Sequence, residues 1–460
     1  MEEKNLRFLI DFGSTFTKLV VVDLDREDII QRYQAPSTVD TDVTIGLKQV
    51  LAQAQTEIGF KELVKDSLLA CSSAAGGLKM ITVGLVPTLS CEAGVRAALG
   101  AGAKMVRTFS YELSLFDLVE IEKIHPDMIL LIGGTDGGNK QNILHNAKIL
   151  ADLNHVVPIV VAGNKDARDV VRSIFNSFGG SITFAENVMP EIGTLQVDSC
   201  REAIRQIFIS RITKAKGIDK AKQIISDVIM PTPAAVLRAA VLLAEGVDEE
   251  KGLGEIVVVD VGGATTDVYS ISKGYPTRSG IMHKGLPEPY AKRTVEGDLG
   301  VRHNIDTLLE IAGMKGGWDN SYFDEIRSRF ASPSKLPEND LEYQLDSLLG
   351  GVAVDIAGER HCGKIKVVGG PFGEVMVQEG KDLSEVKCVI GTGGPLVFAK
   401  DPSRILQGLL FQSDSPHVLR PREAKVYLDR LYSLYAMGLL SETEPKKALR
   451  IMKKVLKPLS

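Results

Sequence analysis

The 460-residue sequence predicts a two-lobed α/β fold that carries an inserted α/β subdomain. Three observations support this prediction: the length, a strand-turn-strand pattern that occurs twice, and a long alternation of strands and helices between the two copies. A chain this long exceeds what one hydrophobic core usually supports, so more than one core is expected. Apolar residues make up 44% and charged residues 25%, as in ordinary globular proteins.

The order of the predicted elements divides the chain into five segments. Residues 1–65 begin lobe I, residues 66–190 form the inserted α/β subdomain, and residues 191–254 add a helical part of lobe I with a connecting helix. Residues 255–420 are expected to form lobe II, and residues 421–460 a helical tail. Short β-rich runs alternate with helical stretches in the inserted segment, which predicts βαβ units and a parallel sheet.

An internal echo carries most of the functional information. The stretch FLIDFGSTFTKLVVV near the N-terminus returns as VVVDVGGATTDVYSI in the second half of the chain. Each copy predicts a strand that ends in an Asp, a tight turn of Gly and hydroxyl residues, and a returning strand. Aligning the copies pairs four positions: Asp11 with Asp260, Gly13 with Gly262, Thr15 with Ala264, and Thr17 with Thr266.

Turns of this composition are typical of phosphate sites. Small side chains let consecutive backbone N–H groups point into one concavity, which binds phosphate oxygens. Two such turns that face each other would hold a polyphosphate from both sides. The residues expected to bind it are Gly13, Ser14, Thr15, Thr17, Lys18, Gly262, Gly263, Thr265 and Thr266.

The two aligned carboxylates point to a metal ion. Asp11 and Asp260 would lie beside the same phosphates, which is unfavourable unless a divalent cation intervenes. Mg²⁺ with oxygen ligands and retained water meets that demand. We therefore expect Asp11 and Asp260 to be the magnesium ligands, and Asp11, Asp260 and Asp267 to be the catalytic acids.

A third glycine-rich element lies in VIGTGGPLVFAK at 389–400. A buried β-run ends in a turn there, and a helix is expected to begin after Pro395. Glycine at such a junction lets a flat adenine or ribose approach the backbone, and the helix N-terminus adds a favourable dipole. Gly391, Gly393 and Gly394 are expected to form this part of the site.

In this order, the three segments resemble the phosphate-1, phosphate-2 and adenosine motifs of the actin, hexokinase and Hsp70 superfamily. The stretch MPTPAAVLRAAVLLAEG at 230–246 resembles its connecting helix. The resemblance implies an actin-like ATPase (ribonuclease H-like) fold that uses ATP and Mg²⁺. Met230 stands where Hsp70-like proteins commonly carry an acid, so hydrolysis is expected to be slow or to rely on Asp260, Asp267, Glu296 or Asp298.

Four stretches extend the resemblance across nearly the whole chain: LLACSSAAGGLKM, LLIGGTDGGN, HKGLPEPYAKRTVEGDLGVRHN and VIGTGGPLVFA. Together they look like the glutamate (methylaspartate) mutase accessory proteins of the MutL type. The resemblance implies a chaperone-like, ATP-dependent reactivating factor that serves the subunits of an adenosylcobalamin-dependent mutase by exchanging damaged cobalamin. No DxHxxG signature is present, so the protein is not expected to hold cobalamin itself.

Two other functions stay open. A small-molecule kinase of the same superfamily would need a carboxylate base over a substrate hydroxyl, which the sequence does not identify. A reductive activator would need cysteines gathered at one edge to hold an iron–sulfur cluster, whereas the five cysteines are scattered. The loop at 127–139, which contains Asp136, is either a third ligand site after a buried strand or an ordinary Gly-rich turn.

Charge and hydropathy exclude some partners. The net charge of −5 argues against nucleic acid, which is bound by basic faces. No run reaches the roughly 18 apolar residues that span a bilayer, and the N-terminal stretch lacks the apolar region of a signal peptide. The sequence therefore predicts a cytoplasmic protein without membrane partners.

Overall fold

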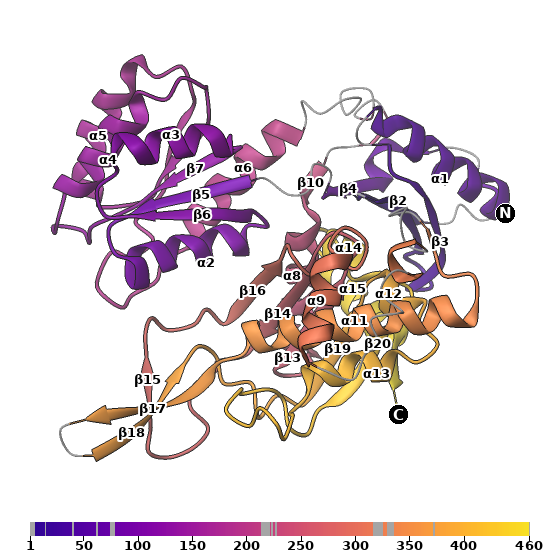
Figure 1. Cartoon of the computed structure of the whole chain (residues 1–460). Helices are drawn as coiled ribbons and strands as arrows, with labels where there is room; N and C mark the ends of the chain where they lie inside the picture. The colour runs from indigo at the N-terminus through magenta and orange to yellow at the C-terminus, as the bar shows by residue number, and fades with distance from the viewer. Residues whose placement is uncertain are drawn as a thin grey trace. The chain divides into compact units, whose positions relative to one another are not determined.

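A computed structural model describes residues 5–459 except 14, 39–40, 61–62, 74–78, 213–220, 222–223, 226–227, 316–324, 329–334 and 371–372. The chain divides into two compact units (Figure 1). Unit 1 comprises Met1–Ala74, Ile212–Lys284 and Tyr290–Ser460, and unit 2 comprises Ala75–Arg211 and Gly285–Pro289. Each unit is built on its own sheets and its own hydrophobic core residues, so the chain has more than one core, as its length predicts.

The first sheet of unit 1 grows from the N-terminal hairpin. Its strands in spatial order are β10 (Val228–Pro231), β4 (Leu68–Ser72), β1 (Leu6–Phe12), β2 (Phe16–Asp23) and β3 (Asp28–Pro36). The β1–β2 hairpin is antiparallel, β4 runs parallel to β1, and β3 runs antiparallel to β2. Helix α1 (Val43–Ile58) packs beside this sheet, and the Asp42 carboxylate caps its N-terminus by accepting from the Thr44 amide.

The second sheet of unit 1 repeats this plan. Its strands in spatial order are β16 (Ala291–Glu296), β14 (Thr266–Ile271), β13 (Ile256–Val261), β19 (Cys388–Thr392), β20 (Lys425–Asp429) and β21 (Leu456–Leu459). The β13–β14 hairpin is antiparallel, β19 runs parallel to β13, and β16 runs antiparallel to β14. Two sheets built on one plan confirm the two-lobed α/β fold predicted from the repeated hairpin.

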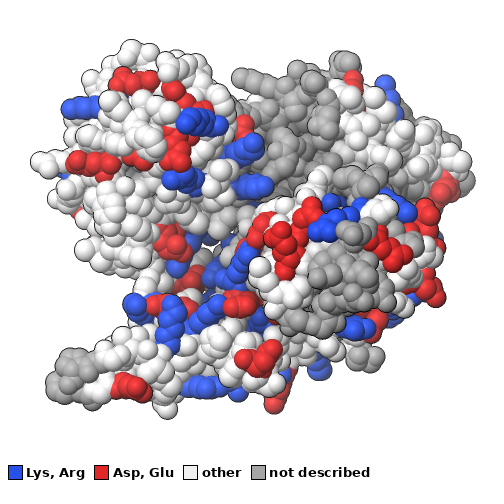
Figure 2. All heavy atoms as spheres, viewed as in Figure 1, with Lys and Arg blue, Asp and Glu red and all other residues white. Residues whose placement is uncertain are grey.

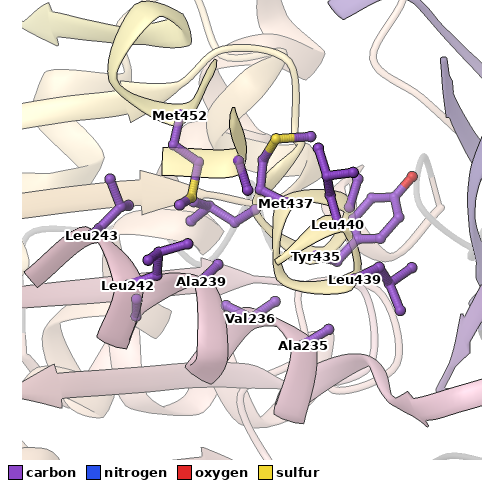
Figure 3. Close-up of a cluster of buried hydrophobic side chains, with 14 of the residues drawn as sticks. Ala235, Val236, Ala239, Leu242, Leu243, Tyr435, Met437, Leu439, Leu440 and Met452 are labelled. Atoms are coloured by element: carbon purple, nitrogen blue, oxygen red, sulfur yellow. The ribbon is translucent and has the colours of Figure 1, made fainter. Parts of the chain in front are cut away.

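Helices between the two sheets form a shared core. They are α8 (Thr232–Glu245), α14 (Leu434–Leu440) and α15 (Pro445–Val455). Figure 3 shows apolar side chains of α8 facing those of α14, with Met452 of α15 beside them. A Cβ on Gly438 would lie 1.9 Å from the Ala235 carbonyl oxygen, so glycine is needed where α14 crosses α8.

A second core covers the other face of the β13–β14–β19 sheet. It is closed by α9 (Ile305–Lys315), α11 (Asp340–His361), α12 (Gly394–Val397) and α13 (Pro402–Leu406). Two small sheets complete unit 1: β11 (Gly246–Val247) with β12 (Glu250–Lys251), and β15 (Ile281–Lys284) with β18 (Gly373–Glu379) and β17 (Lys364–Gly370).

Unit 2 is a parallel sheet with helices on both faces, as the alternating pattern predicts. Its strands in spatial order are β6 (Lys104–Ser110), β5 (Lys79–Gly84), β7 (Met128–Leu131), β8 (Ile159–Val161) and β9 (Ile182–Phe184). One face packs on α3 (Leu115–Ile124), α4 (Gln141–Ala151) and α5 (Arg168–Ile174). Helix α2 (Glu92–Gly100) lies on the other face, where Gly94 packs on Thr82 and Leu130, and α6 (Asp198–Ile212) ends the unit.

Three segments differ from the sequence-based expectations. The strand Leu68–Ser72, assigned from sequence to the inserted subdomain, pairs with β1 of unit 1. The Gly-rich stretch 285–304, whose composition favours a loop, contains β16, and the tail that was expected to be helical contains β20 and β21. In each case the strand pairs with a partner that lies far away in the sequence, so local patterns do not reveal the pairing.

Surface composition agrees with the modest net charge. On the face shown in Figure 2, acidic and basic side chains of the described residues are interspersed. Among the described helices, none has the length and apolarity needed to cross a lipid bilayer.

Candidate functional site

The two hairpin turns have the same geometry. The Gly13 amide donates to the Phe16 carbonyl at 3.1 Å, and the Gly262 amide donates to the Thr265 carbonyl at 2.9 Å. The strand registers also match, because Asp11 lies opposite Lys18 in the first hairpin and Asp260 lies opposite Asp267 in the second. The internal echo in the sequence is therefore a repeated structural device.

Both turns are held from behind through their carbonyl groups. Ser37 donates its amide to the Thr15 carbonyl at 2.9 Å and its hydroxyl to the Gly13 carbonyl at 2.6 Å. In the second turn, the amides of Val301 and Arg302 donate to the carbonyls of Gly262 and Gly263, at 3.1 and 2.9 Å.

The amide groups of the second turn point to an anion site. Within the described residues, the N–H groups of Gly263, Ala264 and Thr265 donate to no acceptor. A turn whose carbonyls are engaged and whose N–H groups are free offers a nest for an anion. The first turn lies close by, because a Cβ on Gly263 would be 3.5 Å from the Thr15 hydroxyl.

The two turns line one cleft inside unit 1. Ten of the residues predicted from the sequence lie on its wall: Asp11, Gly13, Thr15, Lys18, Asp260, Gly262, Gly263, Thr265, Asp267 and Gly394. Four others are not on the wall, namely Thr17, Thr266, Gly391 and Gly393. The hydroxyls of Thr17 and Thr266 are buried, and the latter donates to the Leu299 carbonyl at 2.8 Å. Ser14 lies outside the described residues.

Asp11 is buried at the end of β1 and has two partners. Its Oδ2 accepts from Lys18 Nζ at 3.0 Å, and its Oδ1 accepts from the Thr232 hydroxyl at 2.6 Å. Lys18 is only 8% exposed, so this ion pair is largely shielded from water. The sequence-based argument that a metal ion must balance both Asp residues therefore applies less to Asp11, which already has a cation beside it.

Asp260 differs from the other carboxylates on the cleft wall, Asp11, Asp267 and Asp346. Its Oδ1 is buried and has no hydrogen-bond partner among the described residues. The pKa of Asp260 is raised to about 7, chiefly by burial and then by the neighbouring carboxylates of Asp267 and Asp11, with Lys18 opposing the shift. A buried carboxylate oxygen without a donor is costly and suits a bound cation.

Asp267 forms an ion pair with Arg293 on the neighbouring strand β16. Its Oδ1 accepts from two guanidinium nitrogens of Arg293 on β16, at 2.6 and 2.8 Å, and its Oδ2 accepts from the Thr265 hydroxyl at 2.9 Å. The arrangement ties the second turn to β16 and gives the Asp267 carboxylate a cationic partner.

The residues present fit a magnesium ion that arrives with phosphate. In the described part of the chain, no group of three or more His, Cys, Asp or Glu side chains is placed to hold a metal ion by itself. Mg²⁺ commonly uses one or two carboxylates together with water and substrate phosphates. The unpartnered Oδ1 of Asp260 supplies such a ligand next to the amide nest.

The two glycines after β19 have different roles. Gly393 has a φ of 104°, and a Cβ there would lie 2.2 Å from the Val261 carbonyl oxygen, so it is needed to pack β19 against β13. A Cβ on Gly394 would meet no atom within 4 Å, and this residue lines the cleft. The following helix α12 has four residues, too short for the expected dipole to contribute much.

Several residues on the cleft wall or behind it were not predicted from the sequence. Thr232 and Arg293 hold Asp11 and Asp267, and Arg302 forms an ion pair with Asp346 at the cleft wall. Thr232, Arg293 and Arg302 lie inside stretches that carry the family resemblance, but the sequence gives no indication of which carboxylate each of them contacts. Asp346 and Tyr432 occur in segments without any such signal.

The other sequence candidates lie away from the cleft wall. Glu296 and Asp298 both accept from Arg360, at 2.7 and 2.8 Å. In unit 2, Asp136 accepts from the Lys165 amide at 3.0 Å and from the Asn187 side chain at 2.9 Å, so its carboxylate braces its own loop. The five cysteines are all free and buried: Cys71, Cys91, Cys200, Cys362 and Cys388.

The raised pKa of Asp260 predicts a pH-dependent stability. The folded state binds the proton more tightly than the unfolded state, so ionisation of Asp260 costs stability as pH rises from about 4 to about 7. We expect Asp260→Asn, which stays neutral, to melt at a higher temperature than wild type by a margin that grows over this range and then levels off. Thermal melts in EDTA without nucleotide measure the margin, and a constant margin would contradict the assignment.

Comparisons with known proteins assign nearly the whole chain to one protein family. The family model described as MutL protein matches residues 7–456. Protein MutL of Clostridium tetanomorphum is 48% identical over 455 residues, which cover 97% of this chain and 98% of that protein. Two solved structures also align with the chain. Ethanolamine utilization protein EutJ from Carboxydothermus hydrogenoformans is 13% identical, and the alignment covers 96% of this chain and 89% of that one with a TM-score of 0.33. Xylulose kinase from Bifidobacterium adolescentis is 12% identical, and the alignment covers 99% of this chain and 96% of that one with a TM-score of 0.29. On the family model and the 48% identical relative, which span nearly the full sequence, the chain belongs to the MutL protein family.

Proposed function

We propose that this protein is an ATP-dependent accessory protein that reactivates an adenosylcobalamin-dependent mutase, in particular glutamate mutase, by promoting the exchange of damaged cobalamin. Membership of the MutL family supports the link to the mutase, through the resemblance described above. The observation that carries the nucleotide part is the pair of matched turns at one cleft, with free amide groups beside an unpartnered carboxylate oxygen. We place the protein in the cytoplasm with its mutase.

We assign the phosphates of ATP to the two turns. The N–H groups of Gly263, Ala264 and Thr265 would hold phosphate oxygens from one side, and Thr15 with Lys18 from the other. We assign Gly394, which lines the cleft and where an added Cβ would meet no atom within 4 Å, to the adenosine end of the site.

Asp260 is our first choice for the direct magnesium ligand, and Asp11, which is paired with Lys18, would contribute through a water molecule. Bound Mg²⁺ would neutralise charge that develops on the phosphates. Asp260 would also accept a proton from an attacking water, with Asp267 and Asp11 in supporting roles. Met230 is buried in the core and offers no carboxylate, so we expect hydrolysis to be slow.

The nucleotide acts by biasing the two lobes between open and closed arrangements. A ligand shifts such an equilibrium only by its differential affinity for the two states. A difference of about 3 kcal/mol shifts the populations by roughly a hundredfold, which a few charged phosphate contacts can supply. Closure on ATP and reopening after hydrolysis would drive the mutase partner between conformations that hold and release cobalamin.

Reactivation is the direct test of this proposal. Glutamate mutase inactivated by damaged cobalamin should regain turnover when supplied with this protein, MgATP and fresh adenosylcobalamin. Asp260→Ala should abolish the recovery, whereas Asp298→Asn, which changes a carboxylate outside the cleft wall, should not. Failure of the folded, ATP-binding protein to restore any adenosylcobalamin mutase would overturn the proposal.

The same assay separates the kinase alternative. A kinase would transfer the terminal phosphate to an added small molecule whether or not mutase is present. Among the described residues of the cleft wall, its base would be Asp260, because Asp11, Asp267 and Asp346 are each paired with a cation. Phosphate transfer to a sugar or acid in the absence of mutase would therefore favour the kinase reading.

A further inference from the structure

Tyr432 lies on the turn between β20 and α14 and reaches the first hairpin. Its ring lines the cleft, and the Lys18 ammonium lies 4.1 Å from the ring centroid. The Tyr435 ring is farther from Lys18, at 5.7 Å, and Arg32 lies 5.5 Å from the Tyr432 ring without lining the cleft. Tyr432, which follows a strand of the second sheet, therefore contacts the ammonium of Lys18, which lies on a strand of the first sheet.

The turn that carries Tyr432 has a strained backbone and is held by several hydrogen bonds. Tyr432 has a φ of 51°, a conformation that few non-glycine residues adopt. The buried Asp429 carboxylate holds the turn by accepting from the amides of Ser433 and Leu434, at 2.6 and 2.9 Å. The same carboxylate accepts from the Thr392 hydroxyl at 3.0 Å. Because Thr392 directly precedes Gly393, the turn is anchored to the end of β19.

The position of Lys18 makes the aromatic face important. The Lys18 ammonium is almost completely buried. Its partner Asp11 accepts a hydrogen bond from Lys18 and another from the Thr232 hydroxyl. A cation stripped of water binds an aromatic face more strongly than an exposed one does. Burial raises the pKa of Tyr432, so the phenol is neutral and its ring face, rather than a phenolate, meets the ammonium.

We propose that Tyr432 is a positioning residue that holds the Lys18 ammonium at the cleft wall, where it binds the phosphate chain of the nucleotide. This proposal rests on the nucleotide site described under the proposed function. It makes a specific prediction: loss of the ring face weakens ligands in proportion to their phosphates and leaves the adenosine part unaffected. A residue that merely supported the fold would weaken every nucleotide and adenosine alike.

Two substitutions at Tyr432 test the ring face. Tyr432→Leu keeps apolar volume but removes the ring, and we expect MgATP affinity to fall about tenfold with adenosine affinity unchanged. Tyr432→Phe keeps the ring and should bind as wild type. Tyr427→Leu removes a tyrosine of β20 that does not line the cleft and serves as the matched control. Calorimetry with MgATP and adenosine provides both affinities.

A double-mutant cycle shows whether Tyr432 acts through Lys18. In the Lys18→Met background, Tyr432→Leu should cause no further loss of MgATP affinity, because the cation it positions is absent. Additive losses, or equal losses for adenosine and MgATP, would overturn the proposal. If Tyr432→Leu does not fold, fluorinated phenylalanines at position 432 keep the shape and weaken the ring face stepwise, so unchanged affinity across that series would overturn it. A wild-type protein that binds no MgATP would instead refute the proposed nucleotide site.

Discussion

Asp260→Ala is expected to weaken MgATP binding at least about tenfold, equivalent to about 1.4 kcal/mol. The Asp260 Oδ1 is buried without a partner beside the free amides of the second turn, which is where a nucleotide-bound magnesium would find a ligand. Removing the carboxylate removes that ligand and leaves the amide nest in place. Calorimetric titration with MgATP measures the loss.

The metal dependence of this effect distinguishes ligation from collapse of the site. With EDTA present, Asp260→Ala should bind ATP at least as well as wild type, because the carboxylate then only repels phosphate. Asp298→Asn, paired with Arg360 outside the cleft wall, should behave as wild type under both conditions. Equal affinities of wild type and Asp260→Ala for MgATP would remove Asp260 from the site.

Asp11→Ala should weaken binding to a similar extent for a different reason. It leaves the buried Lys18 ammonium without its carboxylate partner and the Thr232 hydroxyl without its acceptor. A buried charge that loses its partner is strongly destabilising, so this variant should also melt at a lower temperature. Asp260→Ala, which removes a raised-pKa carboxylate, should not.

Gly394→Leu is expected to block nucleotide binding while the protein stays folded. A Cβ at this position meets open space, so the leucine side chain can extend into the cleft where we place adenine or ribose. We expect MgATP and adenosine affinity both to fall by more than about tenfold, since the obstruction lies at the adenosine end. Circular dichroism and the melting temperature should match wild type.

Gly393→Ala is the matched comparison, because the adjacent glycine has a structural role. Its φ of 104° and its contact with the Val261 carbonyl oxygen exclude any side chain without a shift of β19 or β13. This variant should lose stability by about 1–3 kcal/mol. Full nucleotide affinity in folded Gly394→Leu would show that the adenosine lies elsewhere.

Much of the site was predictable because its information is local. The Gly-rich turns, their flanking apolar strands and the opposition of Asp11 to Lys18 follow from residues that are neighbours in one hairpin. Hairpin register depends on turn length and on the alternation of side chains, both of which are written in a short stretch of sequence. The repeated hairpin, the two-lobed α/β class and the parallel sheet of unit 2 were therefore within reach of the sequence by itself.

Only the tertiary structure decided how these parts act. Whether β4 and β20 are strands of unit 1, which of Gly393 and Gly394 faces the cleft, and which carboxylate lacks a partner all depend on distant segments. The same holds for the contact between Tyr432 and Lys18. Burial and electrostatic shifts are set by every group that surrounds a side chain, and chain folding brings those groups together from positions that no local pattern connects.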